Sequence, residues 1–511
     1  MAWWWWLLVQ LAAWCCAILV AVLCWKWATK PHVDAPGPPT LPIIGNILEF
    51  LEMPVTLRKM FDLHRRYGDL TRLYLGPMLV VLVAHPDDAQ HILLTSKLVD
   101  RGSFGTNAMR TFVGDGLVTL DAGRWRVHRK LINPTFHSEI LEGFLEAFHD
   151  GGLFVSERLA RTAGAVTEVH PPVFLAAIRN FCSTVIGMDP DHLMPDALAE
   201  EEISAAMNDG LTTVQKMIVR PWMQNKILLK LTSKGRGLFK FVKILENWAM
   251  QCIAIRSAAT EDGATKTRQR LLEALVKPGG QIVMPLDEVQ GELVNLLIAG
   301  TETTAVTVSY ALALLALHPE WQDAARRELR DVFGDGEDHL RAPSLADLGQ
   351  LRVVESIVKE TLRLFPTVPM LPRVATEDLW LSGGSAKRVL VPKGTLLVVL
   401  PFITHRLPQF FPDPQRFDPS RFLEDRVGKE HAYSYLPFGL GARNCVGSQY
   451  GRLQIKIYLA DILRRFRFLP HSRREDLEES ALSFSLNPIK PIRLSCVPLQ
   501  TPCTKDHTQQ C

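Results

Sequence analysis

Cysteine is scarce in this chain. Nine cysteines occur among 511 residues, an odd number, and no two of them form a CxxC pair. Small disulfide-held scaffolds and zinc-ribbon proteins carry cysteines at much higher density and at regular spacing. Both classes are therefore excluded, and we expect a reduced protein that faces the cytosol.

A charge excess is also missing. The 57 Lys and Arg residues nearly balance the 54 Asp and Glu residues, which leaves a net charge of +3. Nucleic-acid binding proteins need a strong basic field, so we expect no nucleic-acid partner. The chain is 47% hydrophobic and 22% charged, as in ordinary globular proteins, which excludes global disorder. The sequence also lacks internal repeats, low-complexity segments and a strand–helix series typical of a parallel sheet.

One long hydrophobic run is present, at residues 3–25, with Gln10 as its only polar member. As a helix it spans about 35 Å, enough to cross a hydrocarbon core of about 30 Å. Lys26 and Lys30 follow it, and positive residues favour the cytosolic side. A cleaved signal peptide is the alternative, but no charge precedes the run and no small-residue cleavage site follows it. We therefore predict a membrane anchor at residues 1–30, with the remainder in the cytosol.

The rest of the chain is predicted to form one large domain. Residues 31–45 are rich in proline and indicate a stiff hinge. Residues 46–497 are expected to form this domain, and residues 498–511 a polar C-terminal tail.

Hydrophobic periodicity predicts a mainly α fold with a small β region. A helix at 286–317 is apolar on most faces, which indicates a buried central helix. The remaining expectations are helices at 55–67, 351–364 and 449–466, a strand hairpin at 71–75 and 79–83, a strand-like segment at 389–400, and irregular structure at 100–121 and 410–437.

The segment PFGLGARNCVG, residues 437–447, surrounds Cys445 with glycines. Glycine allows a flat ligand to approach the backbone closely and lets N–H groups point at the sulfur. The helix predicted from residue 449 would present its positive end to a thiolate. Arg443, two residues before the cysteine, can meet a carboxylate. The alternative is a buried free cysteine in a glycine-rich loop.

A second unusual segment, AGTETT at residues 299–304, lies within the long helix. Glycine disfavours a helix interior by about 1 kcal/mol relative to alanine. An acid beside hydroxyl residues is also unusual in a buried span. Gly300 would open a groove, and the Thr303 hydroxyl can bond back to the helix and hold a water. A mildly polar helix kink is the alternative.

These motifs resemble the cytochrome P-450 family. The residues from Phe438 to Gly447 fit the haem-binding pattern F-x-x-G-x-R-x-C-x-G at every fixed position. Three further family motifs occur in the family's order, namely W-x-x-x-R (Trp125 and Arg129), the 299–304 segment, and E-x-x-R (Glu360 and Arg363). The resemblance covers about residues 36–497 and implies the cytochrome P-450 fold in a single helix-rich domain.

The resemblance also implies a cofactor, haem b (iron protoporphyrin IX). Cys445 would be its axial thiolate and metal ligand, within a loop that includes Phe438 and Gly439. Family members bind the propionates with residues that correspond here to Trp125, Arg129, Arg373 and Arg443. Thr303 would hydrogen-bond O₂, with Glu302 relaying protons to it. In the family, Glu360 and Arg363 hold a third basic residue, which the segment PQRF at 414–417 suggests is Arg416.

The implied activity is that of a membrane-bound monooxygenase that inserts one oxygen atom from O₂ into a hydrophobic small molecule. Its electrons would come from NADPH through a flavin reductase, docked near Arg124, Arg126 and Lys130 at the endoplasmic reticulum membrane. Family analogy places substrate contacts at 100–121, 298–303, 367–371 and the turn near Phe484.

Two alternatives keep the haem but change the function. One is a relative that isomerises or dehydrates a peroxide without O₂, and the other is a non-catalytic haem-binding protein. Within the family, the chain resembles the clan of fatty-acid ω-hydroxylases and insect detoxifying enzymes. Many ω-hydroxylases carry a haem-esterifying Glu where this chain has Ala299, so that particular activity is not favoured.

Overall fold

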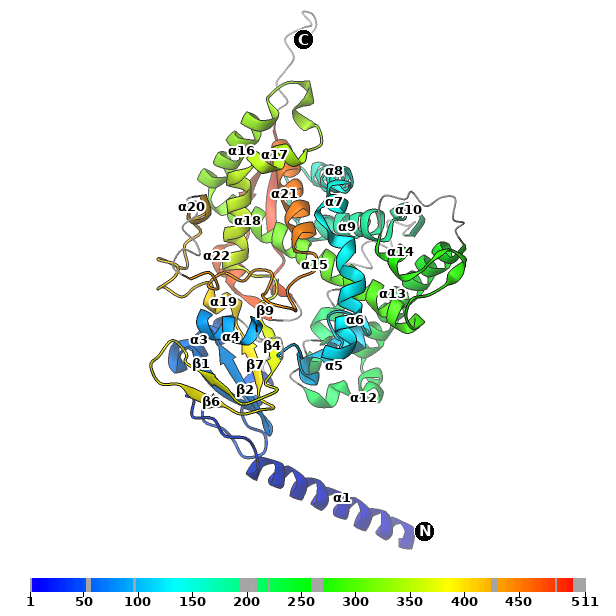
Figure 1. Cartoon of the computed structure of the whole chain (residues 1–511), viewed down its shortest axis with the longest axis vertical. Coiled ribbons are helices and arrows are strands. Elements are labelled where there is room, and N and C mark those ends of the chain that lie inside the picture. The colour runs from blue at the N-terminus through cyan, green and yellow to red at the C-terminus, as the bar shows by residue number, and fades with distance from the viewer. Residues whose placement is uncertain are drawn as a thin grey trace, which may run out of the picture.

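The structure is a computed structural model that describes residues 2–51, 57–94, 98–193, 207, 209–214, 216–218, 220–258, 270–423, 431–482 and 485–499. The Phe484 turn and nearly all of the predicted tail lie outside the described residues. Figure 1 shows a helical body beside a smaller sheet region, with helix α1 projecting from the base. This is the mainly helical architecture with small sheets that the sequence predicted.

The helices include both long spans and single turns. They are α1 (Ala2–Ala28), α2 (Leu48–Leu51), α3 (Leu57–Tyr67), α4 (Pro86–Leu94), α5 (Ser103–Val113), α6 (Ala122–Ile132), α7 (Ser138–Glu142), α8 (Leu145–Arg161), α9 (His170–Asn180), α10 (Pro190–Leu193), α12 (Lys226–Leu231), α13 (Ser233–Ala258), α14 (Leu271–Leu275), α15 (Leu286–Leu317), α16 (Pro319–Phe333), α17 (Leu345–Gln350), α18 (Arg352–Leu364), α19 (Pro401–Thr404), α20 (Ser420–Leu423), α21 (Ser448–Arg465) and α22 (Arg474–Glu478).

The strands are short. They are β1 (Leu70–Leu75), β2 (Met78–Val83), β3 (Val166–Glu168), β4 (Leu371–Val374), β5 (Leu379–Leu381), β6 (Val389–Val391), β7 (Leu396–Val399), β8 (Phe466–Pro470), β9 (Ser480–Leu482), β10 (Leu486–Pro488) and β11 (Arg493–Pro498). The largest described sheet has the order β1-β2-β7-β4, in which β2 and β7 are parallel and the other pairs antiparallel.

Helix α15 occupies the centre of the helical body and is buried along most of its length (Figure 1). It packs against α9 on one side and also contacts α21 and α18. The sequence predicted its bounds, because its apolar run is closed by Pro319. The predicted β1–β2 hairpin and the helices at α18 and α21 are likewise confirmed, to within one residue at most ends.

One secondary-structure expectation is wrong, and another is confirmed only in part. The segment 100–121 contains a helix, α5, between Gly102 and Gly114, which both have positive φ and end the helix sharply. The strand-like segment 389–400 forms two strands, β6 and β7, which belong to different sheets. Pro392 and Gly394 separate them, and this local break outweighed the continuous apolar pattern.

Helix α1 is exposed in the structure. It and α15 are the two described helices that are long and apolar enough to cross a membrane. Most of α15 is buried among other helices, whereas the apolar stretch of α1 has no buried residues. Of these two helices, only α1 is therefore free to contact lipid, which is consistent with a membrane anchor.

The pair Glu360–Arg363 forms as predicted, on α18. Both side chains are fully buried, and Arg363 Nε lies 2.7 Å from Glu360 Oε2. The third basic residue is Arg421 and not Arg416, because Arg421 Nε lies 3.6 Å from Glu360 Oε1. The Arg416 side chain is exposed, and only its backbone carbonyl accepts a hydrogen bond from Arg363.

Replacing Arg421 with alanine is expected to lower the free energy of unfolding by about 1–3 kcal/mol, because it removes a cation from a buried carboxylate. Arg416→Ala is the matched control and should cost less than about 0.5 kcal/mol, since it leaves the backbone carbonyl in place. Denaturant unfolding of the two variants measures the difference. Equal losses would contradict the assignment of Arg421.

Candidate active site

The cysteine loop forms one wall of the principal cavity. Cys445 precedes α21, and its backbone N–H donates to the carbonyl of Phe438 at 2.9 Å. Gly439 and Gly441 both have positive φ, near 70°, where a side chain would strain the backbone. A Cβ on Gly441 would also lie 1.9 Å from the carbonyl oxygen of Leu93. Glycine is therefore required here for the tight turn and for close packing.

The Cys445 side chain is exposed to the cavity. Desolvation by the surrounding protein raises the pKa of its thiol. A hydrogen bond from the Gly447 backbone and the positive charge of Arg129 oppose that rise, because both favour the thiolate. The positive end of α21 also faces this position. The loop thus favours an anionic sulfur once a cation is available to bind it.

The cavity has a volume of about 480 Å³ and is lined mainly by apolar side chains. Helix α15 contributes Ala299, Gly300 and Thr303 to its wall. All five residues of the predicted 367–371 stretch line it as well. The cavity therefore combines the cysteine loop and the threonine segment, which lie far apart in the sequence.

The residues predicted to bind the propionates gather at this cavity, where Trp125, Arg129, Arg373 and Arg443 all line the wall. The Arg443 guanidinium lies 4.3 Å from the centre of the Trp125 ring and donates to three backbone carbonyls. Arg129 donates to the backbone and side-chain oxygens of Asn444, both at 2.9 Å. Arg373 Nε is buried without a hydrogen-bond partner among the described residues.

Arg101 is a fourth guanidinium at the cavity, which the motifs did not indicate. It donates to the carbonyl of Val118 at 2.8 Å. Burial lowers its pKa, and the nearby charge of Arg129 adds to this effect. No local pattern distinguishes Arg101, because it only follows Asp100 in a segment without clear periodicity. The tertiary structure places it at the cavity, where the carbonyl of the adjacent Asp100 accepts a hydrogen bond from the backbone N–H of Val374 in β4.

Among the described residues that line the cavity, none is an aspartate or glutamate that could neutralise these four guanidinium groups. Burial is the main cause that lowers the pKa of Arg373 and Arg443, and the charge of Arg101 lowers both further. Closely spaced buried charges of one sign are costly unless an opposite charge neutralises them. The wall is therefore suited to bind a dianionic group.

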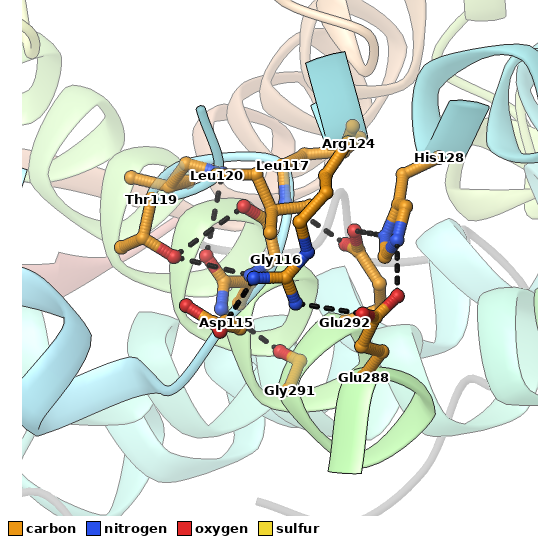
Figure 2. A network of polar contacts seen from close by, with 12 residues as sticks. Asp115, Gly116, Leu117, Thr119, Leu120, Arg124, His128, Glu288, Gly291 and Glu292 are labelled. Carbon is orange, nitrogen blue, oxygen red and sulfur yellow. Dashed lines mark hydrogen bonds and ion pairs between the residues drawn. The ribbon is translucent and has the colours of Figure 1, made fainter. Parts of the chain in front are cut away.

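A polar network holds the 114–120 loop, which supplies two of the carbonyls bound by Arg443 (Figure 2). Glu292 on α15 accepts from the Leu117 backbone at 3.1 Å and lies 2.6 Å from His128 Nδ1. The other ring nitrogen of His128 lies 2.7 Å from Glu288. Burial alone would lower the pKa of His128, but its contacts with these carboxylates raise it overall. The network fixes α6 and the loop against α15.

Arg124 belongs to the same network. Its guanidinium lies 3.1 Å from Asp115 and 2.7 Å from Glu288, as Figure 2 shows. Its charge is therefore paired within the protein, whereas the sequence only grouped it with Arg126 and Lys130 near the expected docking surface. Arg126 and Lys130, on the same helix, are exposed.

The two residues predicted to act on O₂ have different surroundings. The Thr303 hydroxyl lines the cavity and donates to the carbonyl of Ala299 at 2.7 Å, the back-bond expected from the sequence. The neighbouring Glu302 does not line the cavity and is buried, with 1% of its side chain exposed. The structure thus brings Cys445 and Thr303 to one cavity and directs Glu302 to another side of α15.

Comparisons with known proteins identify the family of this chain. The family model described as "Cytochrome P450" matches residues 35–495. The chain is 30% identical to "Cytochrome P450 4c21" of Blattella germanica over 475 residues, which cover 90% of this chain and 92% of the relative. It is 29% identical to "Cytochrome P450 4V2" of Rattus norvegicus over 460 residues, with coverage of 85% and 84%. It is 27% identical to "Cytochrome P450 4c3" of Drosophila melanogaster, with coverage of 86% and 85%. The chain belongs to the cytochrome P450 family of monooxygenases, and its relatives include family-4 members at about 30% identity.

Proposed function

We propose that this protein is a membrane-anchored haem-thiolate monooxygenase that inserts one atom of O₂ into a hydrophobic small molecule. The observation that carries the proposal is that Cys445 and Thr303 line the same largely apolar cavity. A thiolate on one wall and a hydroxyl on another suit the binding and protonation of O₂ beside an apolar substrate.

The residues at the cavity fit haem b. Its propionates would supply the missing negative charge to Arg101, Arg129, Arg373 and Arg443, beside Trp125. The unpartnered Nε of Arg373 in particular needs an acceptor. The Cys445 thiolate would bind the iron, and the Phe438–Gly439 backbone would lie close to the ring. When bound, the haem supplies O₂ activation, which the electron-rich thiolate promotes.

The chain's own residues then control protons and substrate. The Thr303 hydroxyl can rotate from the Ala299 carbonyl to donate its hydrogen bond into the cavity, with Glu302 as the acid that replenishes its proton. The apolar wall excludes bulk water and favours a hydrophobic substrate. Ala299 lines the cavity and has no carboxylate, so it cannot attach the haem through an ester.

Two measurements on the reconstituted protein test the proposal. The reduced protein with carbon monoxide should show the thiolate-type difference spectrum, and substrate should stimulate O₂ uptake that depends on NADPH and reductase. The spectrum without O₂ uptake, together with turnover of a lipid peroxide, would favour the isomerase or dehydratase alternative. The spectrum without either reaction would favour a haem-binding protein.

We propose that a flavin reductase supplies the electrons and docks near Arg126 and Lys130. Exposed charges at an interface act mainly on association rate and are screened by salt. Arg126→Glu and Lys130→Glu should therefore slow reduction at low salt, and the difference should shrink at high salt. Stopped-flow reduction measures this, with Lys393→Glu in the turn between β6 and β7 as a control. Unchanged rates at low salt would place the docking surface elsewhere.

We also propose that residues 1–30 anchor the protein in the endoplasmic reticulum membrane, with residues 31–45 as the hinge and the catalytic domain in the cytosol. Deleting residues 3–25 should convert much of the protein from an integral membrane protein into a peripheral or soluble one, because the main lipid-facing helix is lost. Carbonate extraction of membranes measures the change. A mature chain without residues 1–25 would contradict the anchor.

A further inference from the structure

Glu302 is a buried carboxylate without a hydrogen bond. Neither of its oxygens has a hydrogen-bond partner among the described residues, although only 1% of the side chain is exposed. An unsatisfied buried charge is costly and needs an explanation. Glu292, on the same helix and equally buried, accepts hydrogen bonds from a backbone N–H and a histidine. Glu302 is therefore held much more loosely than Glu292.

The only described ionic partner of Glu302 is His170, the first residue of α9. Its Nε2 lies 3.4 Å from Glu302 Oε2. The imidazole ring lies nearly parallel to the ring of Phe174, with centres 5.8 Å apart and planes 13° apart. This stacking orients the histidine. The side chain of His170 is 26% exposed, so it contacts solvent as well as Glu302.

We propose that His170 is the positioning residue through which solvent protons reach Glu302 and then Thr303. The inference rests on the proposed monooxygenase function and identifies the solvent end of its proton path. His170 meets the two requirements of that end, because it contacts both water and the buried acid.

The transfer involves protons alone. The His170 imidazolium gives its Nε2 proton to a Glu302 oxygen, and the ring then regains one proton from solvent. The Glu302 side chain, free of fixed hydrogen bonds, turns toward the cavity side of α15. It passes its proton to the oxygen of the Thr303 hydroxyl, as that hydroxyl leaves the Ala299 carbonyl and releases its own proton into the cavity. One proton enters from solvent, one leaves at Thr303, and no electron moves.

The test uses full-length holoenzyme with reductase in lipid nanodiscs. His170→Phe retains an aromatic ring against Phe174 but removes the proton carrier. We expect kcat to fall by about tenfold or more and the solvent deuterium isotope effect on kcat to rise. KM, haem content, the carbon monoxide spectrum and the rate of first reduction should stay unchanged. His170→Gln should show the same changes in kcat and in the isotope effect. It replaces His170→Phe in the test if the phenylalanine variant does not fold.

The chain offers a matched control in His318. It lies 3.3 Å from Glu320, is 30% exposed, and also packs on a phenylalanine ring, Phe417. Glu320 is at the surface, so this pair leads to no buried acid. His318→Phe should change neither kcat nor the isotope effect. An equal effect of both substitutions would overturn the proposal.

A measurement without turnover tests the contact itself. In protein labelled with ¹⁵N-histidine, the His170 ring signal is assigned by its loss in His170→Phe. Glu302→Gln should shift this signal, while the His318 signal stays in place. An unshifted His170 signal would overturn the proposal, because the two side chains would then not interact.

Combining substitutions separates this inference from the proposed function. If both residues serve one path, His170→Phe should add little to the defect of Glu302→Gln. A normal spectrum and O₂ uptake with an unaltered isotope effect in His170→Phe would overturn the His170 inference alone. Absence of the spectrum and of O₂ uptake in the unsubstituted protein would instead remove the proposed function.

Discussion

Replacing Cys445 with serine is expected to abolish the thiolate-type Soret band of the reduced carbon monoxide complex, together with all turnover. A serine hydroxyl is a much weaker acid than a thiol and does not supply the electron density that the sulfur does. The loop itself should survive, because serine has nearly the same size and the backbone bond to Phe438 remains. Difference spectroscopy and product analysis measure the two losses.

Cys496→Ser is a suitable control for this substitution. Cys496 is buried in β11 and does not line the cavity. The folded fraction of Cys496→Ser should keep the thiolate-type Soret band. Retention of the band in Cys445→Ser would remove Cys445 from the iron.

The second large effect is expected for Thr303→Ala. NADPH consumption should continue, while hydrogen peroxide replaces most of the hydroxylated product. The lost hydroxyl is the proposed donor of protons within the cavity, so uncontrolled release of reduced oxygen takes over. Folding and haem content should stay nearly normal, because one hydroxyl and one methyl cost about 1–3 kcal/mol. The measurement is the ratio of product to NADPH consumed.

Thr301→Ala is the matched control. Thr301 makes the same bond to the helix, to the carbonyl of Leu297 at 2.7 Å, but it is fully buried and does not line the cavity. This variant should remain coupled. A hydroxyl group on the substrate could take the place of the Thr303 hydroxyl. The test therefore uses a substrate without a hydroxyl group near the carbon that is oxidised. Full coupling of Thr303→Ala with such a substrate would contradict its assignment.

Features set by local chemistry were predictable from the sequence. The bounds of α15 follow from a continuous apolar run closed by a proline, and those of the β1–β2 hairpin from apolar strands around a glycine–proline turn. The cysteine loop could be predicted because its glycines and cysteine are neighbours in the chain. Thr303 was predicted by an unusual polar segment in an apolar helix.

The tertiary structure decided the features that depend on residues far apart. Arg416 and Arg421 both stand in a Pro-x-Arg-Phe segment, so the local sequence does not distinguish them. Only the path of the chain around α18 brings Arg421 to Glu360. Arg101 acquires a role only because its segment packs at the cavity. The direction of Glu302 likewise depends on α9 packing against α15, which brings His170 to it.

The sequence by itself determined the family, the central helix, the cysteine ligand candidate and the apolar N-terminal helix. Each of these is encoded in a short continuous stretch, where periodicity, turn residues or a motif suffices. Which charged side chains meet, and which remain without partners, was decided only by the tertiary structure. Pairing and burial of charge are energies between segments that are distant in the chain, and no local pattern records them.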